Sequence, residues 1–94
     1  YFGITFIHKF MNKRDAKIIS DKVVSALIER QKAVCMTNYQ IAKKTGLSES
    51  TLSYIKDFKQ TPQLMTLILM ADAIDVSLAE VFREVESNNK EFYE

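Results

Sequence analysis

Hydrophobic residues recur at helical intervals over residues 15–34 of the chain. Ile19, Val23, Leu27 and Val34 are separated by four or seven residues, which gathers them on one side of a helix. The other side carries charged residues, as the solvated face of a surface helix does, namely Lys17, Asp21, Lys22, Glu29 and Lys32. This pattern predicts one long amphipathic helix.

A shorter helix is predicted over residues 37–45. Thr37 and Gln40 have the three-residue spacing of a capping box, in which each side chain satisfies a free backbone N–H group at a helix start. Ile41 supplies the buried side of this helix. Gly46 is placed to take the left-handed conformation that ends it.

A third helix is predicted over residues 48–57, after a buried Leu47. Ser48 can cap its first turn, and only Leu52 and Ile55 in it are plainly apolar. The other positions are mostly small and polar, which lowers helix propensity without an evident structural gain. We therefore expect the outer surface of this helix to meet polar groups of a binding partner.

Two more helices follow. Thr61 and Pro62 predict a helix start with proline at the first helical position. The residues that follow, to Ile74, are apolar nearly all round, which predicts the central core helix. Met65 and Met70 are expected to fill gaps in that core. Ser77 and Glu80 form a second capping-box pattern before a short fifth helix that reaches about residue 85. Residues 86–94 are predicted to be a polar tail.

Residues 1–12 are predicted to be an N-terminal arm or a leader. Ile4, Phe6 and His8 alternate with their neighbours in a β-branched and aromatic run that is typical of a strand. A single strand is not stable alone, so it would pair with its copy in a second subunit or lie on the core. In the alternative, the segment is a leader that precedes a true start at Met11.

Composition agrees with an all-α domain spanning residues 13–85. The chain has 94 residues, 47% of them hydrophobic, and only two glycines and one proline, too few for the tight turns of an all-β fold. Cys35 is the single cysteine, which excludes an internal disulfide, and no cluster of ligand residues predicts a metal or other cofactor. We expect Cys35 to pack between the first two helices, and the protein to be cytoplasmic. No apolar run approaches the roughly 20 residues that a membrane span needs.

Charge is unevenly distributed along the chain, although the net charge is only +1. Residues 9–36 contain seven basic and three acidic side chains, and residues 37–61 contain four basic and two acidic ones. Residues 72–94 contain two basic and seven acidic side chains. One part of the protein can therefore attract phosphate while another part repels it.

The two short helices and the Gly46–Leu47 turn between them have the spacing of a helix-turn-helix. The order of these pieces resembles the Cro and phage-repressor type of helix-turn-helix domain, also called the XRE family, from about residue 22 to residue 82. The following residues carry the resemblance: Thr37, Ile41, Ala42, Gly46, Leu47, Ser48, Thr51, Leu52, Ser53, Ile55, Pro62, Leu67, Ala71, Ile74, Val76, Ser77, Leu78, Val81 and Phe82. It implies a compact five-helix lambda-repressor-like fold and a transcriptional regulator that binds double-stranded DNA.

The chain departs from the family pattern at three positions. Members commonly carry glutamine where Asn38 stands, glutamate at Lys56 and glycine at Phe58. Asn38 can still donate to a phosphate, and Lys56 exchanges an internal acid for a positive charge. Because Phe58 has a side chain, we expect that the loop after the third helix does not take a conformation reserved for glycine.

By resemblance, the third helix would enter the major groove with Glu49, Ser50, Ser53 and Tyr54 facing the bases. Glu49 can accept from a cytosine amino group, the serines can donate or accept, and Tyr54 can pack on a thymine methyl group or bond a phosphate. Contacts to the DNA backbone are expected from the helix starts and from the end of the third helix, at Thr37, Asn38, Ser48, Thr51, Lys56 and Lys59. Few cations point at phosphate, so a homodimer on two half-sites is expected.

Simpler interpretations of these residues stay open. Lys43, Lys44, Lys56 and Lys59 also fit an ordinary solvated face. Tyr39 and Tyr54 also fit partly buried supports of the two helices. His8 has no base, nucleophile or metal partner in view.

Two functions from different classes fit the sequence. The first is a repressor or an antitoxin, which would also bind a toxin protein. The second is a protein-interaction module on the same fold that never binds DNA, which the low net charge and Glu49 favour. An enzyme is not expected, because the chain shows no paired carboxylates, no nucleophile with a base and no phosphate-binding glycine loop.

Overall fold

A computed structural model describes residues 10–89, which form five α-helices. They are α1 (Lys13–Ala33), α2 (Asn38–Thr45), α3 (Glu49–Lys56), α4 (Leu64–Ala73) and α5 (Leu78–Asn88). The all-α fold class is thus confirmed, and the predicted N-terminal strand lies outside the described residues. No helix within residues 10–89 combines the length and the apolar character that crossing a membrane requires.

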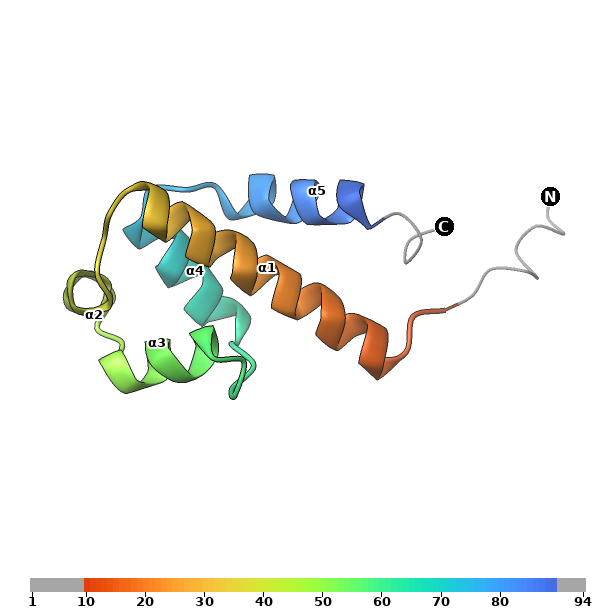
Figure 1. Cartoon of the computed structure of the whole chain (residues 1–94), viewed down its shortest axis with the longest axis horizontal. Coiled ribbons are helices and arrows are strands. Elements are labelled where there is room, and N and C mark those ends of the chain that lie inside the picture. The colour runs from red at the N-terminus through yellow and green to blue at the C-terminus, as the bar shows by residue number, and fades with distance from the viewer. Residues whose placement is uncertain (1–9, 90–94) are drawn as a thin grey trace, which may run out of the picture.

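The long helix α1 supports the rest of the fold. It packs against α5 on one side and against α3 on another, while α2 contacts both α3 and α4 (Figure 1). Val23, Val24 and Leu27 form its buried stripe, and they meet Ile41, Leu52 and Val81 from other helices in one core. Burial of this apolar surface is the main force that holds the helices together.

Side chains cap the starts of α1, α2, α3 and α5. Thr37 and Gln40 form a complete capping box at the start of α2, as predicted. Ser48 caps α3 by accepting from the amide of Thr51, also as predicted. The start of α1 is at Lys13, two residues before the predicted position, because Asn12 accepts from the amide of Asp15 at 2.8 Å.

The start of α4 differs from the prediction. Gln63 occupies the capping position without a side-chain hydrogen bond, and the helix begins at Leu64. Thr61 and Pro62 lie in the loop before it. Pro62 therefore is not the first helical residue, although its fixed φ angle suits an extended loop as well as a helix start.

The prediction that α4 is the central core helix holds for only one of its faces. Leu67, Met70 and Ala71 enter the core, whereas Leu64, Met65 and Ile68 are exposed. The sequence pattern could not separate the two faces because both are apolar. Met70 fills the core as expected, and Met65 does not.

The end of α1 also differs from the prediction. Val34 follows the last helical residue, so it leaves the buried stripe and is half-exposed. Cys35 takes a left-handed conformation, with φ at 56°, and is exposed rather than packed between helices. The chain turns sharply here to start α2.

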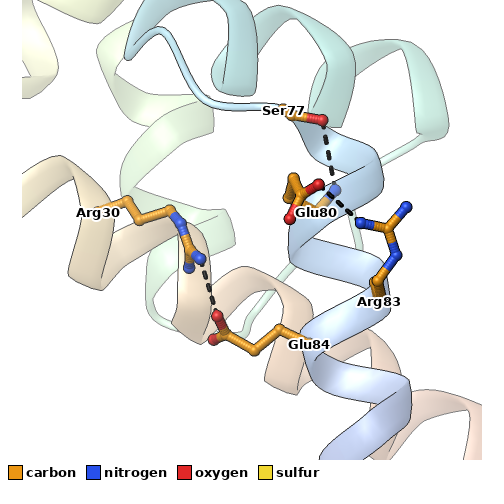
Figure 2. Close-up of polar contacts among 5 residues, drawn as sticks. All are labelled: Arg30, Ser77, Glu80, Arg83 and Glu84. Carbon is orange, nitrogen blue, oxygen red and sulfur yellow. Dashed lines mark hydrogen bonds and ion pairs between the residues drawn. The ribbon is translucent and has the colours of Figure 1, made fainter.

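The carboxyl-terminal helix α5 is held to α1 by polar contacts as well as by the core. Arg30 on α1 donates to Glu84 on α5 at 2.9 Å (Figure 2). At the start of α5, the Ser77 side chain accepts a hydrogen bond from the amide of Glu80 at 3.3 Å. The predicted second capping box is only half formed, because the Glu80 carboxylate pairs with Arg83 at 2.7 Å instead of returning to Ser77. The helix continues to Asn88, and the buried Asn89 side chain then accepts from Lys22 on α1.

Candidate nucleic-acid interface

A tight turn joins α2 to α3. Gly46 ends α2 in the predicted left-handed conformation, with φ at 82°. A side chain there would meet no atom within 4 Å, so the backbone angle alone accounts for the glycine. Thr45 stabilises the turn, since its hydroxyl donates to the carbonyl of Ile41 at 2.8 Å and accepts from the amide of Leu47 at 3.1 Å.

Helix α3 has one buried face and one exposed face. Leu52 and Ile55 are fully buried and fix the helix on the core. The four residues predicted to face DNA bases, Glu49, Ser50, Ser53 and Tyr54, are all exposed. They stand at relative positions one, two, five and six, so they share one side of the helix.

The described part of the chain leaves this exposed face of α3 open. In Figure 1, α5 lies on the opposite side of α1 from α3. The residues of α5 that the sequence marks as acidic are therefore remote from the face that carries Ser50 and Ser53. Within residues 10–89, nothing prevents this face from meeting a partner.

A polar cluster joins α1, α2 and α3 behind this face. Gln31 on α1 is buried and donates to the Met36 carbonyl at 2.8 Å and to Asn38 Oδ1 at 3.2 Å. The Lys56 amine donates to Gln31 Oε1 and to the same Asn38 oxygen. Burial lowers the pKa of Lys56 from its ordinary value of 10.5.

This cluster affects two residues expected to contact the DNA backbone. Lys56 directs its amine inward, so it does not project from the outer surface of α3. Asn38 accepts two hydrogen bonds through its oxygen, which turns its amide NH₂ group away from the cluster. That NH₂ group lies at the start of α2, where the first backbone amides of a helix also have no internal acceptor.

The remaining predicted backbone contacts lie near helix ends. Thr37 and Ser48 are the exposed capping residues of α2 and α3, and Ser48 Oγ also donates to the Thr51 hydroxyl at 2.8 Å. Lys59 is exposed just after α3. The hydrogen bond between Lys56 and Asn38 places the end of α3 next to the start of α2.

Sequence reasoning missed Gln31. A signal was present, because Gln31 stands four residues after Leu27 and seven after Val24, both on the buried stripe of α1. A polar residue at such a position needs hydrogen-bond partners. Sequence reasoning also missed the stacking of Lys43 over the exposed Tyr39 ring, with its amine 5.4 Å from the ring centre.

The prediction for the loop after α3 was wrong. Phe58 does take a left-handed conformation, with φ at 60°, although it has a side chain. Its amide donates to the Ile55 carbonyl at 3.0 Å and the next amide donates to Tyr54 at 2.9 Å, which holds the turn closed. These bonds offset the local strain of about 1–2 kcal/mol.

Two helices joined by a glycine turn, with the second helix exposed, define a helix-turn-helix domain. A family model described as helix-turn-helix matches residues 29–81, more than half of the chain. The chain belongs to this family, the Cro and phage-repressor type or XRE family of DNA-binding regulators. Neither the curated proteins nor the solved structures gave a match to this chain.

Proposed function

We propose that this protein is a transcriptional regulator that binds specific sequences of double-stranded DNA, with α3 in the major groove. The observation that carries the proposal is the open polar face of α3, formed by Glu49, Ser50, Ser53 and Tyr54. A major groove accommodates one α-helix, and it presents a distinct set of hydrogen-bond donors and acceptors for each base pair. Short polar side chains on a rigid helix suit that pattern.

Contacts to phosphate would fix the position of α3 in the groove. Thr37, the NH₂ group of Asn38 and the first amides of α2 are candidates on one side, and Lys59 is a candidate on the other. Ser48 and Thr51 complete this set at the start of α3. We assign Lys56 a positioning role, because its amine holds Asn38 and Gln31 together.

The regulator would act as a homodimer on two half-sites, since few cations are available to bind phosphate in each subunit. Repression and an antitoxin role, in which a toxin protein is a second partner, both fit such a domain. A protein-interaction module is the competing proposal, favoured by the exposed acidic Glu49 at the start of the outward face. The two proposals differ in whether duplex DNA is bound.

A charge placed on the outward face of α3 tests this proposal. We expect Ser53→Glu to weaken binding to a preferred duplex by about tenfold or more, because it adds a negative charge inside the groove. Ser87→Glu adds the same charge to the exposed surface of α5 and should leave the affinity nearly unchanged. Fluorescence anisotropy with a labelled duplex measures both variants.

Two results would count against the proposal. If Ser53→Glu and Ser87→Glu had the same effect, α3 would not be the contact. If the unmodified protein bound no duplex even at low salt, the protein-interaction module would be the better account.

A further inference from the structure

The outer face of α4 is apolar and has no cover within the described residues. Leu64, Met65 and Ile68 leave 63%, 65% and 51% of their surfaces exposed. They stand at relative positions one, two and five of the helix, so they share one side of it. We call these three residues the α4 face. Grouped large apolar side chains on a surface mark a site of interaction.

The chemistry around the α4 face restricts its partner. Residues 60–71 contain no charged side chain, whereas 27% of the whole chain is charged. The neighbouring Gln60, Gln63 and Thr66 are polar but neutral. Such a surface offers nothing to phosphate or to a charged peptide, so the partner must be apolar and neutral where it makes contact.

A second copy of the same chain meets this requirement. In a two-fold dimer the same patch lies on both sides of the contact, so a charged patch would meet its own charge and be repelled. The surfaces of α1 and α5 carry many charges, whereas the α4 face carries none. It is therefore a surface on which two copies can meet without electrostatic cost.

The position of the α4 face suits a dimer that binds DNA. Only the loop of residues 57–63 separates α3 from α4, and Figure 1 shows α4 leading away from the end of α3. Contact through α4 would keep the two copies of α3 near the shared interface. A regulator that binds two half-sites needs such a fixed separation between its two groove-binding helices.

We propose that Leu64, Met65 and Ile68 form the interface through which two copies of this chain pair. The pairing orients the two α3 helices for DNA, and this part of the inference rests on the proposed function. The contact itself depends only on the apolar character and neutrality of the α4 face.

Sedimentation of the full chain without DNA tests the interface. The unmodified protein should shift from monomer to dimer as its concentration rises. Ile68→Glu should weaken the dimer by about a hundredfold or more, because each copy would bring an unpaired charge into an apolar contact. Val34→Glu is the matched control, since Val34 is 50% exposed at the end of α1, and it should dimerise like the unmodified protein.

A charge exchange identifies the partner as a second copy. Ile68→Glu and Ile68→Lys should each be monomeric alone, and a mixture of the two should recover dimers through the opposite charges. Circular dichroism should show that all variants keep their helices, because the changed side chain is half-exposed.

Three results would overturn the inference. They are an unmodified protein that stays monomeric at its highest soluble concentration, an Ile68→Glu variant that dimerises normally, and a mixture that stays monomeric. Because DNA is absent from the experiment, a failure of DNA binding leaves the result intact. A monomeric protein that still binds DNA would contradict the interface alone.

Discussion

The Lys56 side chain acts inside the fold, where its amine meets residues of two other helices. Its amine is held by two amide oxygens, from Gln31 on α1 and Asn38 on α2, and no carboxylate within residues 10–89 shares these hydrogen bonds. A cation in this position joins three helices, because Lys56 itself ends α3. The same bonds orient the Asn38 NH₂ group that we propose as a phosphate donor.

Removal of this amine should lower stability. We expect Lys56→Met, which keeps most of the side-chain volume, to reduce the free energy of unfolding by about 1 kcal/mol at neutral pH, since two amide oxygens lose a donor. Urea unfolding followed by circular dichroism measures the loss. A variant as stable as the unmodified protein would mean that the cluster contributes nothing.

The difference in the free energy of unfolding between the unmodified protein and Lys56→Met should also depend on pH. Burial lowers the pKa of Lys56 in the folded state, while the unfolded chain keeps the ordinary value of 10.5. Between these two pKa values the unfolded chain binds more protons, so raising the pH stabilises the folded protein. The unmodified protein should therefore gain stability relative to Lys56→Met as the pH rises toward 10.5. A difference that stays constant or shrinks would contradict this assignment.

Several residue positions could not be predicted because sequence spacing does not specify direction. The pattern identified Lys56 as a cation on α3, but its inward orientation depends on Gln31, which is 25 residues away in the chain. The interpretation of Tyr39 and Tyr54 as partly buried supports was wrong, because both side chains are exposed. Tyr54 instead lies on the outward side of α3. Its position follows from helix periodicity relative to the buried Leu52 and Ile55, which the sequence shows directly.

At the scale of helices, starts and ends were unequally predictable. The capping residues Thr37, Ser48 and Ser77 act through their own side chains, so the sequence reveals them. The ends of α1, α3 and α4 close differently. In each, a residue two positions after the helix takes a left-handed conformation, and these residues are Cys35, Phe58 and Asp75.

These three ends share one pattern of hydrogen bonds. After α1, for example, the Cys35 amide donates to Lys32 at 3.1 Å and the Met36 amide donates to Gln31 at 3.2 Å. Equivalent pairs of bonds follow α3 and α4, which makes each end a Schellman motif. Glycine usually occupies the left-handed position of this motif. None of these three helix ends has a glycine there, so the sequence did not reveal them.

Replacement of these residues by glycine should therefore stabilise the protein. We expect Cys35→Gly and Asp75→Gly each to raise the free energy of unfolding by up to about 1 kcal/mol, because glycine takes positive φ without strain. The reverse change at Gly46, to alanine, should lower it by about 1–2 kcal/mol, since open space leaves only the backbone cost. Thermal unfolding measures all three variants, and destabilisation by Cys35→Gly would contradict the account.

At the scale of the whole molecule, the helix-turn-helix could be predicted because its residues are local. Residues 37–57 contain both caps, the glycine turn and the buried positions that fix α3. The exposed face of α4 could not be predicted, because an apolar helix can bury either side and the choice depends on distant helices. The α4 face is thus the feature on which structure adds most to the sequence.

Three acidic residues of α5 lie on a part of the fold that is remote from α3, although α3 itself carries Glu49. Glu80, Glu84 and Glu86 lie on α5, and Figure 1 places α5 across α1 from α3. A duplex at α3 would thus stay away from the carboxylates of α5. Under the proposed function, this separation would favour one orientation of the protein on DNA although the net charge is only +1.

Selection from a pool of random DNA duplexes, read by sequencing, tests the central claim most directly. If α3 reads the major groove in a dimer, the bound sequences should converge on a palindrome. Its half-sites should be about one helical turn apart, roughly 10 base pairs between centres. Bound sequences that show no preference, or no binding at any salt concentration, would contradict sequence-specific recognition by this protein.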